Sequence, residues 1–238
     1  MSTPFDAATC SAPETRVARM RDIVVAHAPH DRAIRILDVG CGTGVLAFEL
    51  ASALPYARIT GVDVSAANIS AAAARRREAP GGARVEFERA DYLRYETTPV
   101  DVIVSDTVLH FIPGRRDVLW KKLAGDLGPG GVLICCMAFD CAHNRMLRAA
   151  RRGLRAIRSG ALDAALLAAA RRAYGHEMND ALLRERTEYM YIPPQQFMST
   201  EVRDDLAAAG GLRLIAERAV PSTSLTQLKQ RVTIFRKD

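Results

Sequence analysis

Apolar runs and helical patterns alternate along most of the chain, and this alternation predicts its fold. Between the apolar runs, hydrophobic residues recur at helical spacing. Strands that alternate with helices form right-handed βαβ units around a mostly parallel sheet. The pattern therefore predicts an α/β fold with helices on both faces of the sheet. The runs that suit buried strands occupy 34–39, 57–62, 84–89, 100–105 and 132–138.

The beginning of the chain and one long internal segment depart from this alternation. Residues 1–30 are expected to form an N-terminal helical arm, with a helix that begins near Glu14. Residues 140–192 carry helical patterns without a strand, so we expect a helical insertion, or cap, before the last helix–strand unit. The runs 212–220 and 231–236 complete a seven-stranded sheet and are expected to pair antiparallel at its edge.

Length and composition fit one domain without a membrane anchor. The chain has 238 residues, 49% of them hydrophobic, so we expect a single domain over 1–238. The longest strongly apolar run, 132–139, is too short to span a bilayer, and the first residues lack a secretory-signal pattern. Five cysteines, an odd number, lie in apolar surroundings and suit a reducing compartment. We therefore predict a cytoplasmic protein without a membrane span.

The net charge of +6 comes almost wholly from arginine, and six arginines gather on one segment. A GC-rich coding bias accounts for the choice of arginine over lysine but not for this clustering. On a helix over 145–158, the arginines lie opposite an apolar face. Such a face either attracts an acidic substrate, a nucleic acid or a membrane surface, or is simply solvated. The apolar residues are Met146, Ala150, Leu154 and Ile157; the arginines are Arg145, Arg148, Arg151, Arg152, Arg155 and Arg158.

A glycine-rich turn follows the first apolar run, in the stretch ILDVGCGTG at 36–44. A dinucleotide fingerprint would need a glycine at the position of Val45, and a P-loop would need a lysine nearby. In addition, the carboxylate of Asp38 is a poor neighbour for a pyrophosphate. The turn therefore favours a ligand without phosphate, and a positive charge on that ligand would suit Asp38.

Acidic residues close three successive strands, whose carboxyl ends should meet at one edge of the sheet. Asp63 can accept hydrogen bonds from both hydroxyls of a ribose, each worth roughly 1.5–3 kcal/mol. Asp91 can accept one from an adenine amino group while Val64 packs against the ring. Local roles remain open, because Asp38 can bind amides of the turn and Asp91 can cap a helix. The series indicates a nucleoside pocket.

Taken together, these stretches resemble the class I S-adenosylmethionine-dependent methyltransferases. The matching motifs are ILDVGCGTG, GVDVS, ADYL, VDVIVSDTVLHFI and LGPGGVLI, in that order within 34–139. The resemblance implies a Rossmann-like sheet, S-adenosylmethionine as cofactor and S-adenosylhomocysteine as product. It also implies that Asp63 binds the ribose, and that Asp91 with the amide of Tyr92 reads the adenine. The methionine portion would meet the turn at Gly40, Cys41, Gly42 and Gly44, with Cys41 only a small residue there, and the backbone at Asp106.

Methyl transfer is an in-line displacement that needs the acceptor atom held ~3 Å from the methyl group. A hydroxyl acceptor gains roughly 10²–10⁴-fold from a general base. His110 follows the fourth strand and is the candidate catalytic and substrate-binding residue; alternatively, it only orients a loop or lines the pocket. The stretch Ser-Asp-Thr-Val at 105–108 lacks the Asn/Asp-Pro-Pro-aromatic tetrad of many nucleic-acid amino-methyltransferases, which disfavours that chemistry.

Aromatic residues near the cap offer a wall for the substrate. Phe139, Tyr189 and Tyr191 are candidates for lining a pocket for an apolar or aromatic small molecule, although they can equally pack where the cap docks. A group of cysteines and a histidine resembles a metal-ligand set, but two of them are adjacent in a strand and face opposite ways. We therefore predict no metal site at Cys135, Cys136, Cys141 and His143.

We predict an enzyme that transfers a methyl group from S-adenosylmethionine to an oxygen or nitrogen of a small molecule, with secondary metabolism as one setting. The cap and the N-terminal helix would close over the cofactor and exclude water. Three alternatives stay open: a nucleic-acid or protein methyltransferase that uses the arginine face, a non-catalytic S-adenosylmethionine-binding module, and a nicotinamide-dependent dehydrogenase. The sequence leaves the oligomeric state open, a dimer included.

Overall fold

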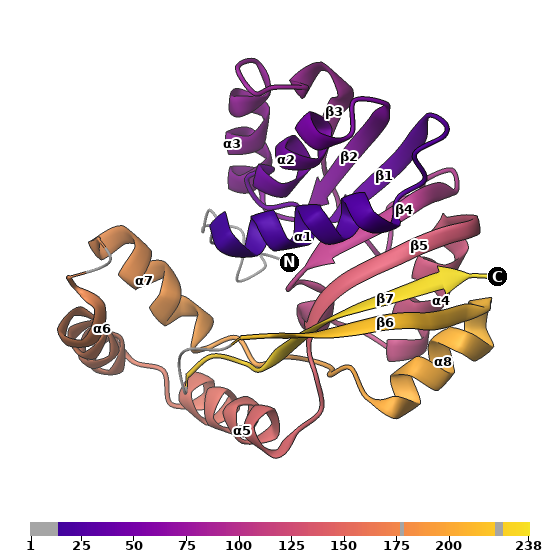
Figure 1. Ribbon diagram of the computed structural model, residues 1–238. Helices are drawn as coiled ribbons and strands as arrows, with labels where there is room; N and C mark the ends of the chain where they lie inside the picture. Colours follow the sequence, from indigo (N-terminus) through magenta and orange to yellow (C-terminus); the bar gives the residue numbers. More distant parts are fainter. Residues whose placement is uncertain (1–13, 177–178, 222–225) are drawn as a thin grey trace.

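The computed structural model describes residues 14–176, 179–221 and 226–238, so residues 1–13 of the expected arm lie outside it. Helices and strands alternate as predicted (Figure 1). The strands are β1 (Ile34–Val39), β2 (Ala57–Asp63), β3 (Val85–Arg89), β4 (Val100–Asp106), β5 (Leu127–Ala138), β6 (Leu212–Val220) and β7 (Gln230–Lys237). The helices are α1 (Glu14–His27), α2 (Val45–Ala53), α3 (Ala66–Arg76), α4 (Arg116–Asp126), α5 (Ala142–Ala156), α6 (Gly160–Tyr174), α7 (Asp180–Tyr189) and α8 (Thr200–Gly210), with short 3₁₀ turns η1 (Gly82–Arg84) and η2 (Leu109–Phe111).

The strands form one seven-stranded sheet in the order β3-β2-β1-β4-β5-β7-β6. β1 to β5 run parallel, while β7 pairs antiparallel with both β5 and β6. The predicted mostly parallel sheet with an antiparallel pair at its edge is therefore confirmed. The strand order reverses between β1 and β4, and in such sheets a ligand binds outside the carboxyl ends of the strands at this point.

One stretch with the sequence of a turn is part of a strand. The Gly-Pro-Gly-Gly sequence at 128–131 predicts a turn, yet it lies within β5. The register between β4 and β5 shifts between Val100 and Val102, and Val100 still pairs with Leu127 beyond the irregularity. Residues 128–131 thus form the irregularity between two paired positions of β5, and Gly130 has φ 71°, so these residues keep a turn-like conformation.

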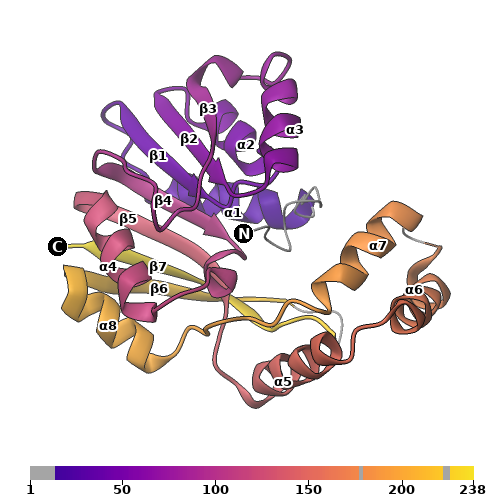
Figure 2. The ribbon, with the colours of Figure 1, turned by 180° about the vertical axis from the view of Figure 1, so that it is seen from behind.

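Two hydrophobic cores cover the two faces of the sheet. α1 and α2 pack on one face, where Met20 and Cys136 belong to the same buried cluster. α4 and α8 pack on the other face, around Trp120 and Cys135, and the two ribbon views show this division (Figures 1 and 2). Cys135 and Cys136 therefore face opposite ways, as their adjacency in a strand predicts. Within the described residues, no group of three potential metal-ligating side chains occurs.

The helical insertion between β5 and α8 contains α5, α6 and α7 and extends beyond the sheet (Figures 1 and 2). Helices therefore fill this segment as the sequence predicts. Its action as a cap stays a prediction. None of the described helices is both long enough and apolar enough to cross a membrane.

The orientation of α5 differs from the one that its apolar face suggests. Met146 and Ile157, on that face, are 62% and 68% exposed, whereas the buried residues are Asn144, Leu147 and Arg151. The expectation of a uniform arginine face, either solvated or free to attract a partner, is therefore wrong at Arg151. The cause is a polar anchor: the Asn144 side chain forms hydrogen bonds of 2.7, 2.7 and 2.8 Å with backbone groups at the end of β5 and the start of β7. These bonds fix the rotation of the helix.

Candidate active site

Three carboxylates meet at the carboxyl ends of β1, β2 and β4. Asp38 is buried, and its burial, together with the negative charges of Asp106 and Asp63, raises its pKa to about 8. Like charges act on each other in this way only at short range. The topology thus gathers acidic side chains at one edge of the sheet, as the sequence predicts for Asp38 and Asp63. The side chain of Asp106 also belongs to this cluster, which the sequence does not predict.

The glycine turn after β1 packs closely against its own chain. Gly40 has φ +74°, and a Cβ there would lie 2.4–2.7 Å from side-chain atoms of Val108. Gly44 has φ +77°, and its Cβ would lie 2.5 Å from the ring of Phe87. Both the left-handed backbone and these distances exclude larger residues. Cys41 is buried and burial raises the pKa of its thiol, which fits a small unreactive residue. The contact of this turn with a methionine portion stays a prediction.

Asp63 links the glycine turn to the start of α3. Its Oδ2 accepts the Gly42 N–H at 3.0 Å, and its Oδ1 accepts the Ser65 N–H at 2.8 Å and the Asn68 side-chain amide at 3.3 Å. A carboxylate offers about four lone-pair sites, so a ligand hydroxyl can still bind here. The structure therefore adds a positioning role to the ribose-binding role that the sequence predicts.

The residues predicted to read the adenine lie after β2 and β3. Asp91 has a side chain that is 52% exposed, and its Oδ1 accepts the Leu93 N–H at 3.1 Å, which closes a local turn. The Tyr92 hydroxyl donates to Asp126 at 2.9 Å, and burial with the Asp126 charge raises the pKa of Tyr92. The Tyr92 side chain is thus committed to α4, which leaves its backbone amide for a ligand. Val64 is half-buried. The adenine contacts stay predictions.

An arginine of α1 reaches the carboxylate cluster. Arg16 Nε donates to Asp106 Oδ2 at 2.8 Å, across 90 positions of sequence. Burial raises the pKa of Asp106, and the Arg16 charge opposes this rise. Thr107, the next residue, has φ 65° and is the one non-glycine residue with positive φ in the described part of the chain. Such strain is common at functional sites. No sequence signal marks Arg16, because the pair joins elements far apart in the chain.

Two oxygens of the carboxylate cluster lack a hydrogen-bond partner. Asp38 Oδ2 and Asp106 Oδ1 are buried, and neither is bonded within the described residues. A buried acceptor without a donor costs about 1–3 kcal/mol, and more when it is charged. A cationic ligand group would remove this cost. S-adenosylmethionine carries an ammonium and a sulfonium, so the cluster fits this cofactor.

His110 lies in η2, directly after β4, and is completely buried. Both of its ring nitrogens lack a partner within the described residues. Burial, with the charges of Arg151 and Arg16, lowers its pKa to about 3. The backbone carbonyl of His110 accepts the Gln195 N–H at 2.7 Å, which holds the turn in place. A neutral ring with this pKa is a weak general base, so His110 is better suited to hydrogen bonding with an acceptor than to removing its proton.

The aromatic candidates lie at separate places. Phe139 follows β5 and is half-buried, with the Arg231 guanidinium 4.2 Å from its ring centre. Tyr191 packs within the insertion against Arg158, 4.3 Å from its ring centre, and burial raises its pKa to about 12. Tyr189 is the last residue of α7. The substrate role of these three rings stays a prediction.

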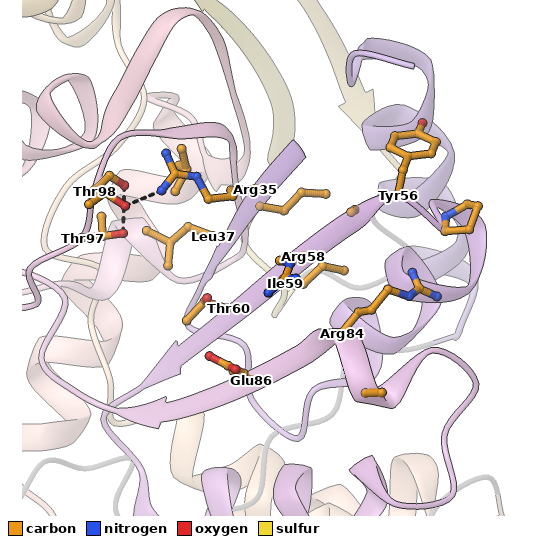
Figure 3. Close-up of a pocket in the computed structure, with 15 residues that line it drawn as sticks. Arg35, Leu37, Tyr56, Arg58, Ile59, Thr60, Arg84, Glu86, Thr97 and Thr98 are labelled. Carbon is orange, nitrogen blue, oxygen red and sulfur yellow. Dashed lines mark hydrogen bonds between the residues drawn. The ribbon is translucent and has the colours of Figure 1, made fainter. Parts of the chain in front are cut away.

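Two surface cavities lie away from the carboxylates. One, of about 470 Å³, opens at the amino ends of β1, β2 and β4, and Figure 3 shows Arg35 there beside Thr97 and Thr98. Arg35 already bonds Thr98 and a backbone carbonyl. The other, of about 400 Å³, lies beside Arg148 and Gln195. We place the candidate site at the carboxylates, because this topology binds ligands at the carboxyl ends and because two buried oxygens without a partner among the described residues, Asp38 Oδ2 and Asp106 Oδ1, lie there.

Comparison with known proteins finds methyltransferases among the proteins similar to this chain. Residues 37–133, which run from the second half of β1 into β5, match a family model described as a methyltransferase domain. The trans-aconitate 2-methyltransferase of Streptomyces avermitilis is 39% identical over 127 residues, which are 52% of this chain and 46% of that protein. The chain spans about half the length of the curated relatives that it matches.

Solved structures confirm the fold. The N-methyltransferase NodS from Bradyrhizobium japonicum WM9 superposes with a TM-score of 0.58 at 18% identity, covering 94% of each chain, and a second structure of that enzyme contains S-adenosylhomocysteine. The [4+2]-cyclase SpnF superposes with a TM-score of 0.64 at 17% identity, covering 98% of this chain and 84% of that one. A fold shared with a cyclase does not by itself define the reaction, so the argument for function rests on the site.

Proposed function

Because the chain belongs to the class I S-adenosylmethionine-dependent methyltransferases, we propose that it transfers a methyl group from S-adenosylmethionine to a small-molecule acceptor. The observation that carries this proposal is the pair of unpartnered, buried carboxylate oxygens on Asp38 and Asp106 beside the glycine turn. These acceptor oxygens suit a cationic nucleoside and are unsuited to a pyrophosphate. S-adenosylhomocysteine is the expected product.

The residues of the chain divide the work of binding. Asp38 and Asp106 hold the cationic portion, and Asp63 accepts a hydrogen bond from a ribose hydroxyl at its remaining lone pair. The bound cofactor supplies an electrophilic methyl group on its sulfonium. His110, buried and neutral at the end of β4, orients the acceptor by hydrogen bonding. Arg16 ties α1 to Asp106, so α1 closes one side of the site and helps to exclude water.

A small acceptor is favoured over a nucleic acid. Three arginines of the insertion pair with acids of the same chain, which weakens a basic field: the pairs are Arg145–Asp140, Arg158–Glu188 and Arg171–Asp180. Several curated relatives are named for trans-aconitate, itself a small molecule. Transfer to oxygen or nitrogen, a place in secondary metabolism, a cytoplasmic location and the oligomeric state are predictions that need their own measurements.

Calorimetric titration with S-adenosylmethionine tests the cofactor part of this proposal. We expect binding by the wild type, and an affinity lower by about 30-fold in Asp63→Ala, because charge-assisted hydrogen bonds to the ribose are lost. Asp117→Asn, at an exposed ion pair on α4, is the matched control and should bind as the wild type does. Thermal unfolding of each variant separates lost binding from lost folding, because Asp63 also bonds the turn.

Product analysis distinguishes the alternatives. S-adenosylhomocysteine that forms only with a small acceptor supports the proposal. Binding without any product against a broad acceptor pool would support a non-catalytic module. Strongly salt-dependent binding to RNA or DNA would favour a nucleic-acid substrate, and binding of NAD in place of S-adenosylmethionine would favour a dehydrogenase.

A further inference from the structure

Arg151 is a buried arginine without an acidic partner. It lies on the buried side of α5 and is only 6% exposed. Its two terminal nitrogens donate to the carbonyls of Ile192 and Thr226 at 3.3 and 3.4 Å, both long bonds, and its Nε has no partner within the described residues. None of the ion pairs formed by the described residues includes Arg151.

Other arginines in or next to α5 are exposed and paired with acids, which is the opposite of the buried Arg151. Arg145 donates to both oxygens of Asp140 at 2.6 Å, although it is exposed. Arg158 pairs with Glu188 at 2.6 Å, also near solvent. Exposed pairs of this kind add little stability, whereas a buried guanidinium without a carboxylate is costly. Among the described residues, acids therefore pair with exposed arginines, and the buried Arg151 has no acidic partner, which indicates that an external anion pairs with Arg151.

His110 provides a second unpartnered group beside this cation. The segment 192–196 lies between them: Arg151 donates to Ile192, and the His110 carbonyl accepts the Gln195 N–H. The Arg151 charge contributes to the lowered pKa of His110, so the two groups are close enough to interact. Both ring nitrogens of His110 are buried and have no hydrogen-bond partner among the described residues. His110 also follows β4, which ends at Asp106, so it lies between the insertion and the carboxylate cluster.

We propose that Arg151 and His110 bind a carboxylate of the acceptor, so that the substrates are carboxylic acids. This proposal rests on the methyltransferase function proposed above. The guanidinium supplies the charge and the planar fork that match a carboxylate, and the neutral imidazole donates one N–H. A single positive charge balances one carboxylate but not the two charges of a phosphate, because Arg16 is already paired with Asp106. The insertion thereby selects the acceptor, and the strand ends bind the cofactor.

Binding of defined carboxylates in the presence of S-adenosylhomocysteine tests this proposal. The probes are benzoate, succinate and trans-aconitate, each compared by calorimetry with its neutral amide, and phenyl phosphate is compared with benzoate. We expect at least one carboxylate to bind about 30-fold more tightly than its amide. Arg151→Gln should abolish this preference, and Arg151→Lys should retain only part of it, because an ammonium lacks the fork. Arg155→Gln, one turn along the same helix and exposed, should change affinity by less than about twofold.

A second measurement needs no variant to fold. In the wild type, nitrogen NMR signals of the His110 ring should shift when a carboxylate binds and stay unchanged with the matching amide. Equal binding of carboxylates and amides, tighter binding of the phosphate, unchanged affinity in Arg151→Gln, or no binding by any carboxylate would each overturn the proposal. In all four cases, binding of S-adenosylmethionine would leave the proposed function standing, whereas a chain that binds no S-adenosylmethionine overturns that function first.

Discussion

The two ends of the candidate site differ in charge, in origin and in what they lack. The acidic end, formed by Asp38, Asp63 and Asp106, lies on strand ends and has unpartnered oxygens. The insertion end, formed by His110 and Arg151, joins η2 to α5 and has unpartnered nitrogens. Burial keeps Asp38 protonated at one end and His110 neutral at the other. Among the described residues, the acidic end therefore lacks hydrogen-bond donors and the insertion end lacks acceptors, so the two ends suit the cofactor and a carboxylate acceptor that we propose for them.

Substitution of Gly40 should have the largest effect, because it distorts the backbone of the glycine turn at the acidic end. A Cβ at Gly40 would collide with Val108 and would also sit at φ +74°. Overpacking costs about 1–3 kcal/mol and a strained φ roughly 1 kcal/mol more. We expect Gly40→Ala to lower the free energy of unfolding by about 2–4 kcal/mol, measured by urea denaturation, and to abolish binding of S-adenosylmethionine.

Gly130 offers a matched control for this prediction. It also has positive φ, 71°, but nothing lies within 4 Å of the position where its Cβ would be. Gly130→Ala should therefore cost only about 1 kcal/mol, the backbone part of the effect. Val108→Ala in the Gly40→Ala background should restore part of the loss. Equal costs for the two glycine substitutions would contradict the role of the Val108 contact.

Asn144→Ala should disrupt the insertion end of the site and leave the acidic end intact. Asn144 fixes the rotation of α5 through three part-buried hydrogen bonds with backbone groups. Asn144→Ala removes these bonds, so we expect a loss of about 2–3 kcal/mol in the free energy of unfolding. Carboxylate binding should weaken because Arg151 loses its position, while affinity for S-adenosylmethionine should stay within about twofold.

Met146→Ala is the control for Asn144→Ala, since Met146 lies on the same helix and is largely exposed. It should change the free energy of unfolding by less than about 0.5 kcal/mol. A parallel loss of carboxylate and cofactor binding in Asn144→Ala would show that the two ends do not act separately. The prediction fails in that case even if the stability falls as expected.

The same contrast explains what could be predicted from the sequence. The strands and the positions of Asp38 and Asp63 follow from hydrophobic pattern and topology, because parallel strands bring their carboxyl ends together wherever the connecting helices lie. The pair Arg16–Asp106 and the burial of Arg151 depend on how α1 and α5 dock. Nothing in the periodicity of α5 reveals that Asn144 anchors the helix, so the apolar pattern alone assigns it the wrong orientation.

The pH dependence of stability should reveal the protonated Asp38 at the acidic end. Asp38 has a folded-state pKa of about 8, against about 3.9 in the unfolded chain. Between these values the folded state holds a proton that the unfolded state has lost, so stability falls as pH rises. From pH 5.5 to 7, Asp38 lowers the free energy of unfolding by about 2 kcal/mol. We expect the ligand-free Asp38→Asn variant to lack this loss, measured by urea denaturation of both proteins across that range.

His110 acts in the opposite direction, and this is why the wild type must be compared with the Asp38→Asn variant. Its folded-state pKa of about 3 lies below the unfolded value of about 6.5, so its contribution to stability rises with pH up to about 6.5. The pH profile of wild-type stability combines the contributions of Asp38 and His110. Only the difference between the wild-type profile and the Asp38→Asn profile isolates Asp38. Binding of S-adenosylmethionine at pH 7 should also release a proton from Asp38, because the cationic ligand favours the carboxylate. Calorimetry in buffers of different ionisation enthalpy measures that release, and equal values for wild type and Asp38→Asn would sink the assignment of Asp38 to the cation.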